Sequence, residues 1–394
     1  MKIERVYIGG WFQRTMLHLT EIYDFLREGT SRLDLNKKKL LDLREELKIK
    51  NLEYSVDGFE YITFSTEFGI DLKIFEDGLI ILSDAEIGNK DLFKDINILT
   101  DYYETKFSPA LSYIFSLGAP VPKELANIQT VYPYFIVLKD ASEKDLKDLL
   151  DQTDKQKYFE ITNDNFDVLR GDKYYFINTK KKNIDKIERF IEEQVFIREF
   201  KGQLHRYLNL HRIIWEKIAD VKENAKVRGR DIIAFTDKID GYAKTINLVD
   251  ARINQMNTYL RTREKIAKED PELKEFLELQ GYRYETLDDT LSYIKQIWAM
   301  TKNYVNSASS LFSDLQQEIT QKSVDNLTIV TSMGVGASII GLFTATEAPS
   351  ITFFGVGYFI ALALIGYSVN KIMKRISENR KYHITDIEYD KNIK

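Results

Sequence analysis

The chain has 394 residues, a length that suits two or three domains, and it carries a net charge of −5 at pH 7. Because this mild acidity is combined with Lys and Arg spread along the whole sequence, the composition gives no support for a nucleic-acid partner. The sequence contains no cysteine, which excludes disulfides, thiolate metal sites and cysteine nucleophiles.

The N-terminal segment combines a strand with two helices. Residues 2–8 alternate as a short strand, which we expect to end at Gly9 and Gly10 before an amphipathic helix over about residues 15–27. A second, strongly charged helix is expected over residues 37–48.

Residues 53–83 have the pattern of a β-meander. Asp57-Gly58 and Asp77-Gly78 are hairpin-turn dipeptides that lie between alternating apolar runs. Further elements are expected as a helical region at about 91–116, a short helix at 142–150, and strands at 131–138, 157–161 and 173–178. Residues 1–183 are therefore predicted to form an α+β cytoplasmic domain, which we expect to sense a ligand.

From residue 184 onward the pattern is helical. A long helical pair is predicted over residues 184–285, and Asp270-Pro271 is expected to end its second helix near Lys268. A stalk helix is predicted over 286–326, because its apolar residues alternate spacings of four and three, as in a coiled coil or helix bundle. This seam consists of Leu287, Leu291, Ile294, Trp298, Thr301, Val305, Ala308, Phe312, Leu315 and Ile319. Neighbouring helices of the chain or other subunits must cover it.

Two uncharged stretches near the C-terminus predict a transmembrane hairpin. Residues 327–346 and 348–370 form stretches of 20 and 23 residues. At ~1.5 Å per residue, a helix of 20 residues is roughly as long as the 30 Å hydrocarbon core of a bilayer is thick. Glu347 is the only charge between them. The second stretch is followed by Lys371, Lys374, Arg375, Arg380 and Lys381.

The charge distribution predicts the orientation of this hairpin. Because the loop between the two stretches has no Lys or Arg, the positive-inside rule places both termini in the cytoplasm, with residues 371–394 as a basic tail. The N-terminal residues MKIERVYIGGW lack the apolar core of a signal peptide. We therefore expect a protein of the inner (plasma) membrane.

The segment QKSVDNLTIVTSMGVGASIIGLF (321–343) is similar to the stalk-to-pore junction of the CorA-like cation-channel superfamily. The order of domains also resembles that family. The resemblance implies a pentameric funnel in which the first spans surround a pore and the second spans face lipid. At the outer mouth the family has Gly-Met-Asn, which holds a hydrated magnesium ion, whereas this chain has Ala345-Thr346-Glu347.

The resemblance extends to CorA-like proteins of type III CRISPR defence, which are divergent membrane effectors opened by a nucleotide second messenger. It implies an ion channel gated through the cytoplasmic domain by such a messenger, for example SAM-AMP or a cyclic oligoadenylate. One alternative is a divalent metal cation (Mg²⁺) transporter regulated by its own ion. Another is a membrane-anchored oligomeric scaffold without conductance. An enzyme is not expected, because no nucleophile, base and orienting group occur in a recognisable arrangement.

The candidate pore residues follow from extending the seam into the first uncharged stretch. The stripe consists of Val324, Leu327, Thr328, Thr331, Val335, Ser338, Leu342 and Ala345, with Thr346 and Glu347 at the outer mouth. In an oligomer, Val335 and Leu342 would form apolar rings between polar rings of Thr331 and Ser338. Such an arrangement suits a gate that closes by dewetting. The alternative is that the hydroxyls bond between helices while glycines allow close packing, and that Glu347 is a solvated loop residue.

The candidate ligand site is the glycine-rich segment Gly9, Gly10, Trp11, Phe12 and Arg14. A turn between a strand and a helix presents backbone N–H groups to an anion, while an arginine pairs with phosphate and an aromatic ring stacks on a base. The alternative is a glycine turn flanked by core aromatics. A divalent cation or a nucleotide messenger is the expected ligand, and no resident cofactor or metal site is assigned.

Overall fold

The structure is a computed structural model. It describes residues 1–13, 18–56, 59–84, 92–115, 134–154, 156–162, 166–180, 184–223, 226–269, 274–344 and 353–383. The chain forms two compact units, the first comprising Met1–Leu208 and Val249–Lys295 and the second comprising Asn209–Leu248 and Gln296–Lys394.

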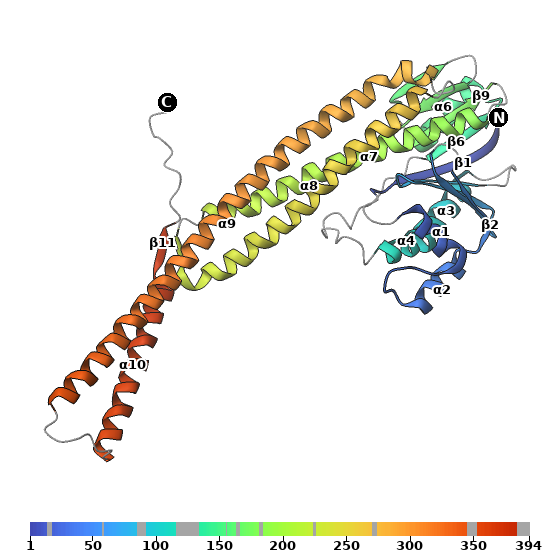
Figure 1. Cartoon of the computed structure of the whole chain (residues 1–394). Helices are drawn as coiled ribbons and strands as arrows, with labels where there is room; N and C mark the ends of the chain where they lie inside the picture. Colours follow the sequence, from blue (N-terminus) through green and yellow to red (C-terminus); the bar gives the residue numbers. More distant parts are fainter. Residues whose placement is uncertain are drawn as a thin grey trace, which may run out of the picture. The chain divides into compact units, whose positions relative to one another are not determined.

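The first unit is built on a mixed β-sheet (Figure 1). Among the described residues the sheet has nine strands in the order β2-β3-β4-β5-β1-β6-β9-β8-β7. All neighbours are antiparallel except β6 and β9, which are parallel. The strands are β1 (Lys2–Trp11), β2 (Ile49–Ser55), β3 (Tyr61–Thr66), β4 (Ile70–Phe75), β5 (Leu79–Asp84), β6 (Tyr134–Lys139), β7 (Phe159–Thr162), β8 (Phe166–Arg170) and β9 (Tyr174–Thr179).

The predicted meander is confirmed as β2 to β5, whereas the predicted end of β1 was wrong and one strand was missed. Strand β1 does not end at Gly9, because Gly9 and Gly10 pair with Ile81 and Ile80 of β5. Strand β8 was not predicted. It is a five-residue strand between β7 and β9, and a segment this short gives little periodic signal.

Alternation along β1 separates the two faces of the sheet. Val6 and Ile8 belong to a hydrophobic core with the shorter helices, which thus cover one face. These helical segments are α1 (Leu19–Glu28), α2 (Lys37–Glu46), α3 (Leu92–Tyr102), the π-helix η1 (Tyr103–Phe107), α4 (Ser108–Phe115) and α6 (Glu143–Thr153). Arg5 and Tyr7 lie on the opposite face, where both bond to Glu188 of α7.

Three long helices follow: α7 (Ile184–Glu223), α8 (Ile232–Glu269) and α9 (Lys274–Thr344). The helical pair was predicted with nearly these bounds. Helix α9 begins earlier than the expected residue 286, because its first turns contain good helix formers, such as Lys274 and Leu277, shortly after Pro271.

The predicted seam of α9 is confirmed as its buried face. Its members from Leu287 to Phe312 are all at most 5% exposed, and Leu315 and Ile319 are partly buried. Helices of the same chain cover the seam. In the second unit, Phe312 stacks on Phe235 of α8 with ring centroids 6.0 Å apart.

The second unit ends in the helix α10 (Phe353–Asn379). The basic residues that begin at Lys371 were predicted to form a tail, but up to Asn379 they continue this helix, because KIMKRISEN contains no helix breaker. After α10, the short strand β11 (Lys381–His383) pairs with β10 (Lys226–Arg228), which precedes a 3₁₀ turn, η2 (Gly229–Asp231), and α8.

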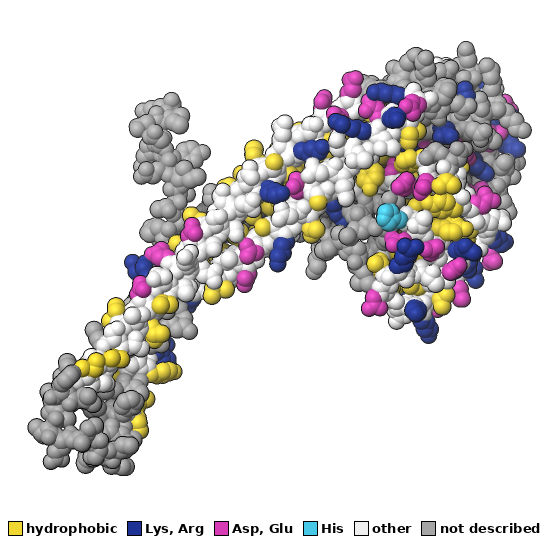
Figure 2. All heavy atoms as spheres, in the orientation of Figure 1, with side chains coloured by type: hydrophobic (Ala, Val, Ile, Leu, Met, Phe, Trp, Pro, Cys, Tyr) yellow, Lys and Arg dark blue, Asp and Glu magenta, His cyan; other side chains and the backbone are white. Residues whose placement is uncertain are grey.

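The C-terminal part of α9 and α10 exposes many apolar side chains (Figure 2). They include Val324, Leu327, Ile329, Val335, Ile339, Ile360, Leu364, Ile365, Ile372 and Ile376. Within the described part of the chain, however, no helix combines the length and apolar character needed to cross a membrane.

Candidate functional site

A cavity of about 360 Å³ lies in the first unit between the sheet and α7. It is lined by residues of β1 to β5 and by one face of the helix. The polar side chains around it are Arg5, Tyr7, Asn51, Glu53, Thr63, Ser65, Asp71, Lys73, Ser83, Glu188 and Glu192.

Secondary structure explains why these side chains converge. Arg5 and Tyr7 are two residues apart in β1, so both lie on one face of the sheet, and the same holds for Asp71 and Lys73 in β4. Glu188 and Glu192 of α7 are four residues apart and so share one face of the helix. Glu192 pairs with Lys73 across the cavity.

Arg5 joins both walls of the cavity. Its guanidinium lies 3.1 Å from the carboxylate of Glu188 and 3.4 Å from that of Asp71. The Tyr7 hydroxyl donates a second hydrogen bond to Glu188, at 3.0 Å. Burial raises the pKa of Asp71, and the Arg5 charge opposes this shift. Burial, together with the Glu188 charge, also raises the pKa of Tyr7, so that its hydroxyl remains a donor.

Lys73 makes a second link between the sheet and α7. Its ammonium group lies 2.7 Å from the carboxylate of Glu192. The same ammonium lies 4.6 Å from the ring centre of Tyr61 and 4.7 Å from that of Phe75, so two aromatic faces hold it in place.

The charge balance of the cavity decides which ligands suit it. Two cations, Arg5 and Lys73, face four carboxylates, and both cations are already paired. Of these carboxylates, Glu53 forms no ion pair with another described residue. The excess negative charge opposes a polyphosphate and favours a cationic or neutral polar group.

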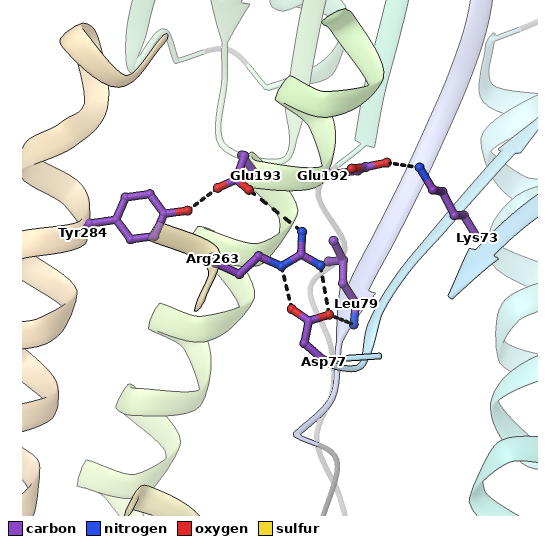
Figure 3. Close-up of polar contacts among 7 residues, drawn as sticks. All are labelled: Lys73, Asp77, Leu79, Glu192, Glu193, Arg263 and Tyr284. Atoms are coloured by element: carbon purple, nitrogen blue, oxygen red, sulfur yellow. Dashed lines mark hydrogen bonds and ion pairs between the residues drawn. The ribbon is translucent and has the colours of Figure 1, made fainter. Parts of the chain in front are cut away.

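A second polar cluster lies next to the cavity and is fully buried (Figure 3). Arg263 of α8 forms a two-pronged ion pair with Asp77, in the turn between β4 and β5, at 2.6 and 2.9 Å. Arg263 is 3% exposed and Asp77 is 2% exposed. The backbone N–H of Leu79 also donates to Asp77, at 3.1 Å. The turn is thus tied to α8 by a charge pair that solvent does not reach.

Glu193 extends this buried cluster to a third helix. Its carboxylate lies 3.9 Å from the Arg263 guanidinium and accepts a hydrogen bond from the Tyr284 hydroxyl of α9. Burial raises the pKa of Glu193 to about 7, against the opposing effect of Arg263. Burial also raises the pKa of Tyr284. Glu193 thus connects α7 to both α8 and α9.

Two adjacent residues of α7 therefore serve different partners. Glu192 pairs with Lys73 at the cavity, whereas Glu193 contacts Arg263 and Tyr284 (Figure 3). A ligand that displaces Glu192 from Lys73 would act on the same helical turn that holds α8 and α9. Glu192 and Glu193 thus place the cavity and the buried cluster on the same turn of α7.

The first residues of the predicted anion-binding turn lie in a strand. The predicted turn was wrong, because Gly9, Gly10 and Trp11 lie within β1. Trp11 is 3% exposed, its indole N–H donates to the Asp77 carbonyl at 2.9 Å, and its ring meets Phe196 edge to face. These contacts make Trp11 a core residue, as the alternative interpretation expected.

Phe12 and Arg14 are the other two residues of the predicted site. The Phe12 backbone N–H donates to the Gly78 carbonyl at 3.1 Å. Arg14 lies outside the described residues.

Gly9 allows α7 to approach the sheet closely. A Cβ atom at this position would lie 2.8 Å from Val195 Cγ2 and 2.9 Å from Ile81 Cδ1. We expect Gly9→Ala to lower the free energy of unfolding by about 1–3 kcal/mol through overpacking. Thermal and denaturant unfolding monitored by circular dichroism would measure this loss. Gly202→Ala is the matched control, because nothing lies within 4 Å of its Cβ position; equal effects of the two substitutions would contradict the packing role.

The predicted pore residues lie on α9, and their hydroxyls bond to their own helix. Thr331 donates to the Leu327 carbonyl at 2.8 Å, and Ser338 donates to the Gly334 carbonyl at 2.9 Å. Thr328 likewise donates within the helix. The Leu342 side chain, Ala345, Thr346 and Glu347 lie outside the described residues. Pore lining stays a prediction.

Sequence reasoning missed both polar clusters. In the part of the chain that the structure describes, no group of His, Asp and Glu has an arrangement suited to a metal ion. The only local signal for the cavity was a strand such as IDLKIF, in which polar and apolar residues alternate although both faces are covered.

No protein-family model matches the chain, and no curated protein matches it. Among solved structures, it is similar to the CorA magnesium transporter from Methanocaldococcus jannaschii, with 10% sequence identity. The match covers 62% of this chain and 89% of the other, and its TM-score is 0.20. A likeness this slight does not assign a function.

Proposed function

We propose that this chain is a homo-oligomeric, CorA-like membrane channel in which a ligand-sensing α+β unit acts on a long helix that leads into the bilayer. The observation that carries the proposal is the continuity of α9, a single helix of 71 residues. Near its start, Tyr284 bonds to Glu193 in the buried cluster. From Leu327 to its described end at Thr344 it carries no charged residue. One continuous helix thus joins the sensor unit to the apolar segment.

Membrane insertion of the C-terminal hairpin is supported by sequence and by exposure. Residues 327–346 and 348–370 are uncharged, and basic residues follow the second stretch. In the single chain, apolar side chains such as Leu327, Ile360 and Leu364 are exposed to solvent. Burying this surface in lipid or against other copies would remove a large apolar area from water.

A homo-oligomer would place α9 of each subunit around a central pore. The sequence resemblance implies that this oligomer is a pentamer. Val324, Leu327 and Val335 are exposed on α9 and belong to the predicted pore stripe. The hydroxyl groups of Thr331 and Ser338, bonded within their own helix, would present polar rings between the apolar ones.

The proposed ligand is a nucleotide second messenger, such as SAM-AMP or a cyclic oligoadenylate, and the proposed output is ion leakage in type III CRISPR antiviral defence. This part follows from the sequence resemblance. The segment Ala345-Thr346-Glu347 differs from the family's Gly-Met-Asn, which favours a channel over a magnesium-selective transporter. Gating requires the ligand to bind the open state more tightly than the closed state.

Flux through vesicles tests the proposal. The full-length protein would be reconstituted into liposomes loaded with an ion-sensitive dye, and each candidate messenger would be added to the outward-facing sensor units. We expect messenger-dependent cation flux that is weakened in Glu347→Lys. Empty vesicles and a non-adenine nucleotide serve as controls. Mg²⁺ flux that needs no messenger would support a transporter, and an inserted protein without flux under any ligand would refute the channel and support a scaffold.

A further inference from the structure

Two rows of polar side chains cross the sheet beneath α7. Residues directly opposite each other on neighbouring strands lie on the same face of a sheet. One row consists of Ser65, Asp71, Ser83 and Tyr7, and the next consists of Glu53, Thr63 and Lys73. All of these residues line the cavity between the sheet and α7. The sheet thus presents a polar surface to a helix that covers it.

A β-bulge in β2 places Glu53 on this surface. Lys50 pairs with Ser65, but Glu53 pairs with Thr63 rather than with the residue before it, so the register has shifted by one. Asn51 lies at the shift with a φ of 48°, and its side-chain amide donates to the Ser65 hydroxyl at 3.2 Å. In a regular register Glu53 would face the hydrophobic core on the other side of the sheet. Bulges commonly redirect side chains beside binding sites in this way.

The carboxylates of the cavity retain unused acceptor oxygens. In the described part of the chain, Arg5 contacts only Oδ2 of Asp71, and Lys73 contacts only Oε1 of Glu192. The carboxylate of Glu53 has no ion pair with a described residue. Because the cavity has four carboxylates and two cations, a ligand that brings ammonium N–H groups would match both its charge and its acceptors.

Ser83 adds a buried hydroxyl at the centre of the first row. It is 5% exposed, and it lies between Asp71 and Tyr7 in the strand register. Its hydroxyl group has no hydrogen bond with another described residue, although it lines the cavity. A buried hydroxyl without a partner is unfavourable, and a ligand in the cavity would supply that partner.

We propose that this cavity binds a small organic cation of the aliphatic diamine class. One ammonium group would bind Glu53 on β2, and the other would bind Asp71 and Ser83 on β4 and β5. Strands β2 and β4 are separated by β3 and so lie about 10 Å apart, which suits an extended molecule with a charge at each end rather than a single metal ion. A volume of about 360 Å³ is in the usual range for small-molecule sites.

The cation would be a ligand in addition to the anionic messenger of the proposed function. The negative excess of the cavity opposes a polyphosphate, so the two ligands would not share this site. The inference does not depend on conduction, because binding is measured on the protein in detergent.

Calorimetry on the full-length protein would test the site, with 1,4-diaminobutane as the probe. We expect the diamine to bind and 1,4-butanediol, which has the same chain length but no charge, not to bind. Glu53→Gln and Ser83→Ala should each weaken diamine binding about three- to tenfold. Neither substitution removes a side-chain bond between described residues, so both variants should fold. Glu46→Gln is the matched control, because Glu46 is an exposed glutamate of α2 outside the cavity lining.

A second measurement locates the ligand in the wild-type protein. A water-soluble carbodiimide activates a carboxylate, and a bound amine then forms an amide with that carboxyl carbon while the carbodiimide leaves as its urea. We expect peptide mass spectrometry to find the diamine on Glu53 at concentrations that leave Glu46 unmodified. The inference would be overturned by absence of diamine binding at millimolar concentration, by equal binding of the diol, by displacement of the diamine by equimolar Mg²⁺, or by unchanged affinity in both folded variants.

Discussion

Replacing Arg263 by methionine is expected to lower the free energy of unfolding by about 3–5 kcal/mol. The substitution would leave Asp77 as a carboxylate in a site that solvent barely reaches, without the guanidinium that now pairs with both of its oxygens. It would also remove the cation that lies 4.8 Å from the ring centre of Phe75. Denaturant unfolding followed by far-ultraviolet circular dichroism measures this loss.

Two controls show whether the loss comes from the unpaired charge. The double variant Asp77→Asn/Arg263→Met removes both charges and keeps an acceptor for the Leu79 N–H, so it should be clearly more stable than the single variant. Lys265→Met breaks an ion pair on the same helix whose partners are both exposed, and it should change stability by less than about 1 kcal/mol. Equal losses in the single and double variants would contradict this account.

The second large effect is expected at Trp298 in the second unit. Its side chain is fully buried in the seam of α9, where the ring meets His211 of α7 edge to face. Trp298→Ala should cost about 3–5 kcal/mol, because it leaves a cavity that the helices cannot fill completely. The same unfolding measurement detects it.

Trp298→Phe separates the contribution of ring packing to stability from that of the indole N–H. The indole N–H of Trp298 has no hydrogen-bond acceptor among the described residues, so losing it removes no bond. Phenylalanine should therefore cost much less than alanine. If phenylalanine and alanine are equally destabilising, the contribution of Trp298 does not come from its packing.

Local patterns predicted much of the fold. The β-meander followed from alternation and from turns such as Asp77-Gly78, where Gly78 has a φ of 91° that glycine adopts without strain. The seam followed from heptad spacing, since residues such as Leu291 and Val305 lie on one helix face wherever the helix packs. Both signals come from residues that are close to one another in the sequence.

The polar clusters could not be predicted in the same way. Lys73 and Glu192 are 119 residues apart, and Asp77 and Arg263 are 186 residues apart. Nothing in either local segment indicates the partner, because the pairs arise only when α7 and α8 pack on the sheet. For the same reason Gly9 looked like a turn residue: the close approach of Val195 that requires it comes from a helix far along the chain.

The proposed channel requires the apolar end of this chain to lie in a bilayer. Because the sequence has no cysteine, a single introduced cysteine takes a nitroxide label without background. Labels would be placed at Ile360→Cys and, as an aqueous control, at Met300→Cys, two positions whose native side chains are 56% and 60% exposed. In liposomes, we expect oxygen to speed the spin relaxation of the label at 360, while a water-soluble nickel chelate has little effect on it. At 300 we expect the nickel chelate to have the larger effect. Equal access of the nickel chelate to both labels would contradict it.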